Sequence, residues 1–284
     1  MKKLTELFIT LILMLFMLMS IVLSAAAETA SVKTYNGTVV IDGIMDDEWK
    51  YAEEFTANEH DSNYWTASTD PKTASARFRT LWDENYIYIW CEITDPTVVT
   101  ASRSSLWLTD CMIYHIDYAN NKAGGFDAAK AGYIYVTAGK GLESVAKVFD
   151  GAIDAFKCSY KISAPGWIIE MAIPAKALDF TLTEGGKIGF EPQYNDSNDA
   201  GASGERVGLC TWNIKGAGGY ADTSLYGTLV LSGISPEKPK EQPKEEPTDI
   251  ENTNPATGDP FSALIILTLA SLTASVVVKS KRNK

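Results

Sequence analysis

Carboxylates at turns are the residues whose type and position most directly suggest chemistry in this sequence. Asp42 and Asp46 lie in the segment IDGIMDDEW, and Asp95 lies in ITDP, where Gly and Pro indicate turns. Hard oxygen ligands on turns suit Ca²⁺. The spacing of these residues does not follow an EF-hand loop. They are therefore candidate metal ligands without a calcium-loop motif.

Catalytic motifs are not visible in the sequence. It contains neither G-x-S-x-G nor H-E-x-x-H. His60 and His115 are isolated, and nothing in the sequence places either beside a nucleophile, so we expect both to be structural. Glycoside hydrolysis needs two positioned carboxylates, which an acidic chain could supply by chance. We predict a protein that is not an enzyme, with an enzyme as the minor alternative.

Four cysteines leave two interpretations open. Cys91, Cys111, Cys158 and Cys210 could form two disulfides in an exported protein. Each lies within an apolar, strand-like run, so buried free thiols are at least as well supported. A zinc site is not expected, because the sequence has no C-x-x-C pair and no Cys/His cluster.

The elements that must position these residues are strands. From Tyr86, side chains alternate, with Ile87, Ile89, Cys91 and Ile93 on one face. Tyr86, Tyr88 and Trp90 share the other face, and we expect this stripe to pack between the sheet and its loops. The turn WDEN joins this strand to 77–82 and predicts a hairpin.

Further strand-like runs follow between Gly, Asn, Asp and Pro. Long amphipathic helices are absent from the sequence, and PAKAL at 174–178 predicts one short helical turn. About ten strands favour an all-β fold, a β-sandwich, as one domain over 32–233. The remaining predicted strands are 111–118, 133–138, 156–162, 167–173, 188–194, 208–213 and 226–231.

The N-terminus predicts export. Lys2 and Lys3 precede an apolar run over 7–23, and small residues then allow cleavage after Ala27. Residues 1–27 therefore predict a signal peptide, with an uncleaved anchor as the alternative. The net charge of −11 repels nucleic acid and anionic lipid, so neither is an expected partner. Residues 234–253 are rich in Pro, Glu and Lys and predict an extended spacer.

The C-terminus combines three features over residues 254–284. The pentapeptide NPATG precedes an uncharged apolar span over 261–278 and a basic stub. This order resembles the Leu-Pro-x-Thr-Gly wall-sorting signal of Gram-positive surface proteins. The resemblance implies that a sortase-type cysteine transpeptidase cleaves after Thr257 and transfers the chain to peptidoglycan. The matching positions are Asn254, Pro255, Thr257 and Gly258, with Asn replacing Leu; a plain transmembrane anchor is the alternative.

The order of segments in the domain resembles the family 9 carbohydrate-binding modules and the wider DOMON-like group. These segments are VIDGIMDDEW, LWDENYIYIWCEITDP, DCMIYHIDYANN, GWIIEMAIPAKAL, IGFEPQYNDSND and YGTLVL, and the resemblance covers about 35–232. It implies a jelly-roll-like sandwich that binds poly- or oligosaccharides, often at chain ends, with bound calcium. The calcium expectation for Asp42, Asp46 and Asp95 rests mainly on this resemblance.

The resemblance also implies which residues hold a sugar. Trp107, in RSSLWLTDC, and Tyr220, in GAGGYADT, would clamp the ring, while Gln193 and Asn195 would bind its hydroxyls. Two charged family positions differ: the family's Arg falls at Tyr135, which we keep as a fifth candidate sugar-binding residue, and the family's Glu falls near Ile113.

Three alternatives stay open. Trp107 and Tyr220 could cover the ends of the core, and Gln193 could be an ordinary surface strand residue. The protein could be a structural wall protein or adhesin with a decayed sugar site. Some DOMON-like relatives bind haem. Met112 and His115 are conceivable haem ligands, but they fall on opposite faces of one predicted strand.

Overall fold

The protein is described by a computed structural model that covers seven segments of the chain. The predicted signal peptide, most of the spacer and the whole sorting signal lie outside these segments. None of the helical elements in these segments has the length and hydrophobicity that a membrane span requires. All described residues belong to one compact unit that ends at Pro239. The segments are 29–60, 74–101, 103–122, 124–178, 180–197, 205–215 and 218–239.

Thirteen strands form the described part of the fold. This confirms the all-β prediction, and the hairpin and the short turn at Ala175–Leu178 are also present as predicted. The strands are β1 Ser31–Asn36, β2 Glu54–Ala57, β3 Glu59–His60, β4 Ser75–Trp82, β5 Tyr86–Thr94, β6 Cys111–Asp117, β7 Ala131–Thr137, β8 Gly141–Lys147, β9 Lys157–Ile162, β10 Gly166–Pro174, β11 Lys187–Ser197, β12 Arg206–Thr211 and β13 Gly227–Ser232.

The remaining regular elements are short 3-10 turns. They are η1 Asp47–Tyr51, η2 Leu106–Leu108, η3 Ile153–Ala155, η4 Ala175–Leu178, η6 Gly218–Tyr220 and η7 Thr223–Leu225. Two of these turns, η2 and η6, carry the two aromatic residues predicted to clamp a sugar.

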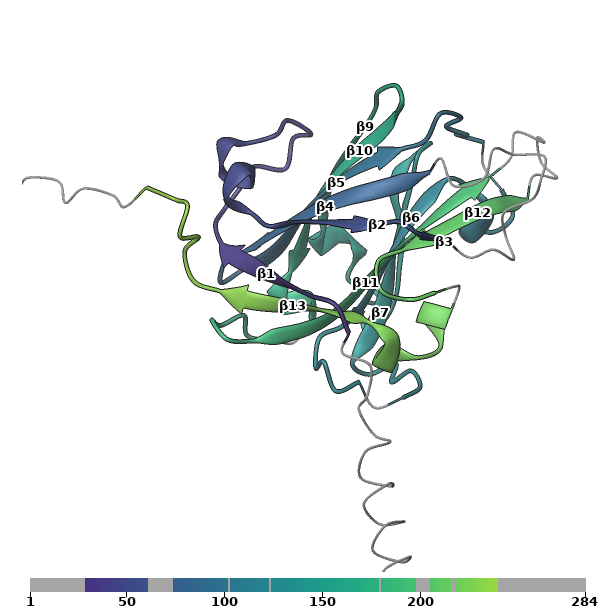
Figure 1. Cartoon of the computed structure of the whole chain (residues 1–284). Coiled ribbons are helices and arrows are strands. Elements are labelled where there is room, and N and C mark those ends of the chain that lie inside the picture. The colour runs from purple at the N-terminus through teal and green to yellow at the C-terminus, as the bar shows by residue number, and fades with distance from the viewer. Residues whose placement is uncertain are drawn as a thin grey trace, which may run out of the picture. The chain divides into compact units, whose positions relative to one another are not determined.

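The strands pair in the order β8-β7-β6-β11-β13-β1-β4-β5-β10-β9. β12 adds to the second half of β11, and β2 pairs with β4. Figure 1 shows β4, β5, β10 and β9 side by side, with β11, β13 and β7 in the other part of the fold. β1 links these parts because it runs parallel to both β13 and β4. The outcome is a nearly closed, sandwich-like sheet.

The main core follows from strand alternation. Ile87, Ile89, Cys91 and Ile93 are buried in it, as the sequence predicts. Most even-numbered residues of β6, β7 and β11 reach the same core from their strands, among them Tyr114 and Tyr194. Because successive side chains point to opposite faces, the odd-numbered residues of these strands lie on the outer face. That outer face forms the floor of the site described below.

A second, smaller apolar cluster covers the opposite face of β5. Tyr88 and Trp90 are buried there against Trp49 of η1 and Tyr35 of β1. Tyr88 also donates a hydrogen bond of 2.6 Å to Asp83, whose carboxylate accepts the N–H groups of Asn85 and Tyr86 at the hairpin turn. The prediction that the Tyr86, Tyr88 and Trp90 stripe packs between sheet and loops is confirmed for Tyr88 and Trp90.

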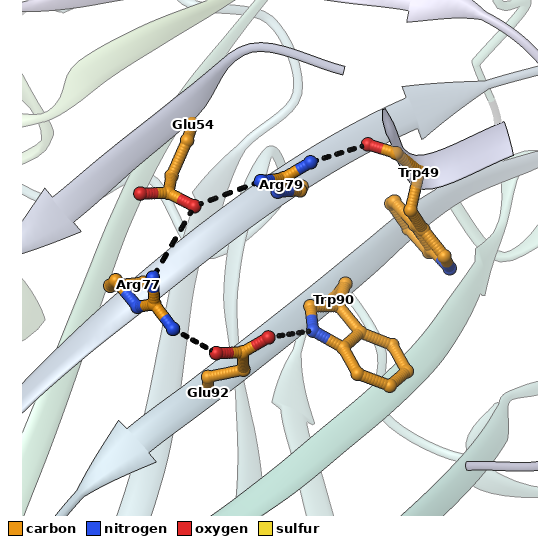
Figure 2. Close-up of polar contacts among 6 residues, drawn as sticks. All are labelled: Trp49, Glu54, Arg77, Arg79, Trp90 and Glu92. Carbon is orange, nitrogen blue, oxygen red and sulfur yellow. Dashed lines mark hydrogen bonds and ion pairs between the residues drawn. The ribbon is translucent and has the colours of Figure 1, made fainter. Parts of the chain in front are cut away.

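A chain of polar contacts borders this cluster (Figure 2). Arg77 pairs with Glu92 across β4 and β5, and Glu92 accepts a hydrogen bond of 3.0 Å from the indole of Trp90. Glu54 of β2 bonds Arg79 at 3.1 Å. The pairs are partly exposed, so we expect each to contribute less than about 1 kcal/mol. These contacts connect the side chains of β2, β4 and β5 across neighbouring strands.

Some parts of the fold differ from the sequence prediction. Strands β1, β2, β3 and β8 were not predicted, because their sequences are short or mix polar and apolar residues without clear alternation. All four cysteines are free thiols. This settles the open choice against two disulfides, with Cys158 half-buried and the other three buried.

Candidate functional site

A hollow of about 460 Å³ opens on the outer face of β7, β6, β11 and β12. Volumes of this size are typical of small-molecule sites. Four of the five residues predicted to hold a sugar line this hollow, namely Trp107, Tyr135, Gln193 and Tyr220. The lining residues are Trp107, Ile113, His115, Tyr133, Tyr135, Gln193, Arg206 and Tyr220.

Strand register explains the floor of the hollow. Tyr135, Ile113 and Gln193 form one row across β7, β6 and β11. Tyr133 and His115 form the next row. Residues two apart on a strand share a face. Side chains from three strands therefore converge on one surface, although the alternating neighbours of each point into the core.

Two aromatic rings project at the rim. Trp107 in η2 is 45% exposed and Tyr220 in η6 is 64% exposed. By contrast, Trp49, Trp167, Tyr114 and Tyr194 are fully buried. Exposed flat rings around a hollow indicate a binding site, since an apolar ring gains free energy by covering an apolar ligand face. These exposures do not fit the alternative that the two residues cover the ends of the core.

The turn that carries Tyr220 is held from below. Tyr133 donates a hydrogen bond of 2.7 Å from its hydroxyl to the backbone carbonyl of Tyr220. Tyr226 likewise bonds the carbonyl of Gly219, at 2.5 Å. A Cβ at Gly219 would lie 3.1 Å from the His115 ring, so glycine permits this close approach. The turn therefore rests directly on the floor of the hollow.

Glu191 anchors the start of the same loop. Its carboxylate is buried and accepts the backbone N–H groups of Trp212, Asn213 and Ile214 at 2.9, 2.8 and 3.2 Å. Burial raises the pKa of Glu191 to about 7, although these hydrogen bonds act in the opposite direction. Because one side chain receives three successive N–H groups, it fixes the path by which the chain leaves β12.

Asn195 lies beneath the hollow instead of in its wall. It is fully buried. Its side-chain oxygen accepts hydrogen bonds from Gln193 at 2.9 Å and from Arg206 at 3.2 Å. The structure therefore gives Asn195 a supporting position, which differs from the direct sugar contact implied by the resemblance. Gln193 lies in the wall, as that resemblance implies.

Arg206 completes the rim beside Trp107. Its guanidinium carbon lies 5.4 Å from the centroid of the Trp107 ring, within the range of a cation–π contact. The sequence interpretation missed this residue because the predicted strand began at Gly208, two residues later. The structure extends β12 to Arg206 and pairs it with Ser197 of β11.

His115 and Tyr133 were also missed as site residues. His115 is buried, and neither ring nitrogen has a hydrogen-bond partner among the described residues. Burial lowers its pKa to about 4, so the imidazole is neutral at pH 7. A signal for both was available in the sequence: because residues two apart on a strand share a face, His115 lies on the same face as Ile113, and Tyr133 on the same face as Tyr135. Met112 lies in the core on the other face of β6, as expected.

A second group of residues forms an acidic cluster. Asp95, Asp110 and Asp196 each place a carboxylate oxygen within 4.8 Å of the others. Asp95 was a predicted metal ligand, whereas Asp110 and Asp196 were missed because they come from separate strand ends. Asp42 and Asp46 lie in a different place, where their carboxylates accept the N–H groups of Ile44 and Val40 in their own turn.

The acidic cluster is largely buried and partly hydrogen-bonded. Asp110 accepts the N–H groups of Val99 and Ser197, and Asp95 accepts the Tyr194 hydroxyl. Burial, together with the neighbouring Asp95, raises the pKa of Asp110 to about 8. Three close carboxylates repel one another at low dielectric, and a bound divalent cation would remove that repulsion. Their hard oxygen atoms suit Ca²⁺ better than a softer metal.

Comparison with known proteins identifies the class. The family model described as "Carbohydrate family 9 binding domain-like" matches residues 41–234. The chain belongs to this family. The fold agrees with a solved family 9 carbohydrate-binding module from Caldicellulosiruptor kristjanssonii in complex with cellotriose. That module is 24% identical, has a TM-score of 0.60, and the match covers 72% of this chain and 95% of the module.

Curated relatives are larger enzymes. Exoglucanase XynX of Acetivibrio thermocellus is 30% identical over 75% of this chain but 18% of its own length. Endo-1,4-beta-xylanase A of Thermotoga maritima is 33% identical over 69% of this chain and 17% of its own length. The chain thus spans less than a fifth of these relatives, and their similarity concerns one part of each.

Proposed function

We propose that the described domain binds one sugar unit of a polysaccharide or oligosaccharide without catalysing a reaction. One observation supports this most strongly. Trp107 and Tyr220, from distant parts of the chain, project as exposed rings at the rim of one hollow. Gln193 offers an amide in its wall. Flat rings suit the C–H faces of a pyranose, and amides suit its hydroxyls.

A β-1,4-linked glucan or xylan end is the proposed ligand class. Solved family 9 modules from C. kristjanssonii are complexes with cellotriose and with glucose. Each stacked ring would contribute on the order of 1–2 kcal/mol. With few polar contacts, we expect dissociation constants of roughly micromolar to millimolar.

The composition of the site favours binding over hydrolysis. Glycosidases place two carboxylates beside the scissile bond. Among the described residues that line the hollow there is no carboxylate; its polar groups are an amide, an imidazole, a guanidinium and phenols. Calorimetric titration of the purified protein with cellotriose and xylotriose tests the proposal. Saturable binding without release of shorter sugars supports it, and hydrolysis of either probe would contradict it.

We also propose that Ca²⁺ binds at the acidic cluster. Asp95, Asp110 and Asp196 would supply its carboxylate ligands, and their close approach supports the proposal. The role would be structural. Asp110 directly precedes β6 and lies three residues after Trp107, so a cation there would brace the base of the loop that carries Trp107.

Display on a Gram-positive cell wall is the third part of the proposal. Its support is the sequence order of NPATG, the apolar span over 261–278 and the basic stub. The spacer would hold the binding domain away from the wall, because Pro-rich segments are extended and semi-rigid.

A further inference from the structure

Rings of Trp and Tyr form half of the described lining of the hollow. Tyr133 and Tyr135 of β7 share the face that forms its floor, and Trp107 and Tyr220 lie at its rim. Ile113, the neighbour of Tyr135 on β6, continues the apolar part of the floor. An apolar group of a ligand that enters the hollow therefore meets ring and hydrocarbon atoms, against which its burial is favourable.

Several polar groups of the lining are already engaged within the protein. The Tyr133 hydroxyl donates to the carbonyl of Tyr220 at 2.7 Å. The Gln193 amide donates to the buried Asn195 at 2.9 Å, and Arg206 donates to the same oxygen at 3.2 Å. Each of these contacts uses hydrogen-bonding capacity that would otherwise face a ligand.

His115 is the remaining polar side chain of the floor, and its nitrogens are enclosed. Both are buried without a hydrogen-bond partner among the described residues. The turn η6 covers the ring, since a Cβ at Gly219 would lie 3.2 Å from Nε2. Glu191 lies opposite His115 on β11, but its carboxylate is bound to loop N–H groups. Neither side chain therefore offers a ready partner to a sugar hydroxyl.

This supply of polar groups bears on the kind of sugar that fits. A hydroxyl that leaves water without finding a partner loses free energy. An acetyl group removes the hydroxyl donor and puts a methyl group and a carbonyl in its place. The methyl group gains from contact with rings. The carbonyl can accept the second N–H of the Gln193 amide, because an amide nitrogen carries two hydrogens.

We propose that the hollow prefers a pyranose unit that carries an acetyl group over the same unit with free hydroxyls. This inference rests on the proposed function, because it assigns a ligand class to the same hollow. The acetyl methyl group packs against Tyr135 on the floor, and the acetyl carbonyl accepts from Gln193. An O-acetyl ester and an N-acetyl amide present the same group, so the test includes both.

Two pairs of probes test the proposal on the purified protein. They are xylotriose with its mono-O-acetyl form, and D-glucose with N-acetyl-D-glucosamine. We expect an acetylated probe to bind at least about fourfold more tightly than its partner, the factor that corresponds to burial of one methyl group. Calorimetry or ligand-observed NMR gives the ratio of the dissociation constants. Mild alkali removes the ester and should return the affinity to that of xylotriose.

The two pairs distinguish the linkage. A preference in both pairs supports recognition of the acetyl group itself. A preference in one pair supports the inference and shows that the site also reads the ester or the amide. Equal or weaker binding of both acetylated probes would overturn the inference.

Variants at Tyr135 assign the preference to the floor. Tyr135→Phe keeps the ring and should keep the ratio of affinities. Tyr135→Gln replaces the ring by an amide that can bond a free hydroxyl, so it should bring the ratio close to one. Tyr160→Gln is the matched control, because it removes an exposed tyrosine of β9 outside the hollow. It should keep the wild-type ratio, and thermal unfolding checks that each variant is folded.

The outcomes separate the two proposals. If wild-type protein binds xylotriose or glucose and shows no preference for the acetylated probes, the inference is wrong and the proposed function stands. If folded Tyr135→Gln keeps the wild-type ratio, the floor does not set the preference and the inference is wrong. If none of the four probes nor cellotriose binds, both proposals are wrong. The wild-type ratios alone decide the matter should Tyr135→Gln fail to fold.

Discussion

The hydroxyl of Tyr133 donates a 2.7 Å hydrogen bond to the backbone carbonyl of Tyr220. This bond joins the floor of the hollow to its rim, because Tyr133 belongs to β7 and Tyr220 to the 3-10 turn η6. Phe126 stacks on the Tyr133 ring at 4.9 Å and His115 packs against its edge, so the donor is held in place. A rim aromatic placed by a rigid strand is ordered before a ligand arrives.

Tyr133→Phe should loosen the Tyr220 turn without unfolding the protein. The substitution removes one hydrogen bond, which contributes about 0.5–1.5 kcal/mol. We expect binding of cellotriose to weaken by about two- to tenfold, measured by calorimetry. Tyr160→Phe is the matched control, since Tyr160 also donates from its hydroxyl to a loop carbonyl, that of Gly139. Equal affinity in wild type and Tyr133→Phe would show that the bond does not position Tyr220 for binding.

Glu191 should make stability depend on pH. Its folded pKa of about 7 lies above the ordinary value of 4.5, because burial disfavours the charged carboxylate. The folded state therefore holds this proton more tightly than the unfolded state, and the resulting stability is present below pH 4.5 and lost as pH rises to about 7. The loss is of order 3 kcal/mol at most.

Glu191→Gln should flatten that part of the profile. Glutamine cannot ionise, yet its carbonyl can still accept the N–H groups that Glu191 receives. Urea unfolding between pH 4.5 and 8 measures the slope for both proteins. Asp196 has a pKa raised to about 7 and contributes to the same window, so the comparison is of the difference between wild type and variant. Identical slopes would mean that Glu191 does not titrate in this range.

Calcium should stabilise the protein through the acidic cluster. At a free concentration 100-fold above its Kd, a ligand that binds only the folded state adds about 2.7 kcal/mol. Wild type should melt at a higher temperature in Ca²⁺ than in chelator. Asp196→Asn should lose this shift, and in chelator it should be as stable as wild type or more so, because one repelling charge is gone. Asp42→Asn, in a separate turn, is the control that should keep the shift. A melting temperature unaffected by Ca²⁺ in wild type would contradict the proposed site.

Wall anchoring should depend on Thr257. Transpeptidation leaves the threonine carbonyl attached to a cell-wall amine, so Thr257→Ala should leave the protein in the membrane fraction or in the medium. Wild type should stay with detergent-washed walls in the same cells. The measurement is an immunoblot of the three fractions, with Thr248→Ala in the spacer as control. Equal wall retention of wild type and Thr257→Ala would contradict a sorting signal.

Strand alternation made much of the fold predictable. β5 shows why: its Ile and Cys residues reach the main core, and its Tyr and Trp residues fill the second cluster. β1 could not be foreseen, because it pairs in parallel with β13, at the opposite end of the domain, and with β4. Such non-local pairing leaves no periodic signal in the six residues of the strand.

The site was predictable only in part. Trp107, Gln193 and Tyr220 came from the resemblance to a family, and the structure brings them to one hollow. His115 and Tyr133 would have followed from counting two residues along strands already predicted. Arg206, Asp110 and Asp196 meet their neighbours only through the tertiary fold, so no local pattern marks them. Asn195 was expected to bind a sugar hydroxyl, but the structure buries it fully and bonds it to Gln193.

The most direct test of sugar binding is the affinity of Trp107→Ala for cellotriose, measured by calorimetry beside wild type. Trp107 is exposed at the rim, so its removal should abolish measurable binding while the melting temperature changes by only a few degrees. Tyr160→Ala, which removes an exposed aromatic ring outside the hollow, should bind as wild type does. Undiminished binding by folded Trp107→Ala would contradict the proposed site, and loss of the folded state would show that Trp107 belongs to the core.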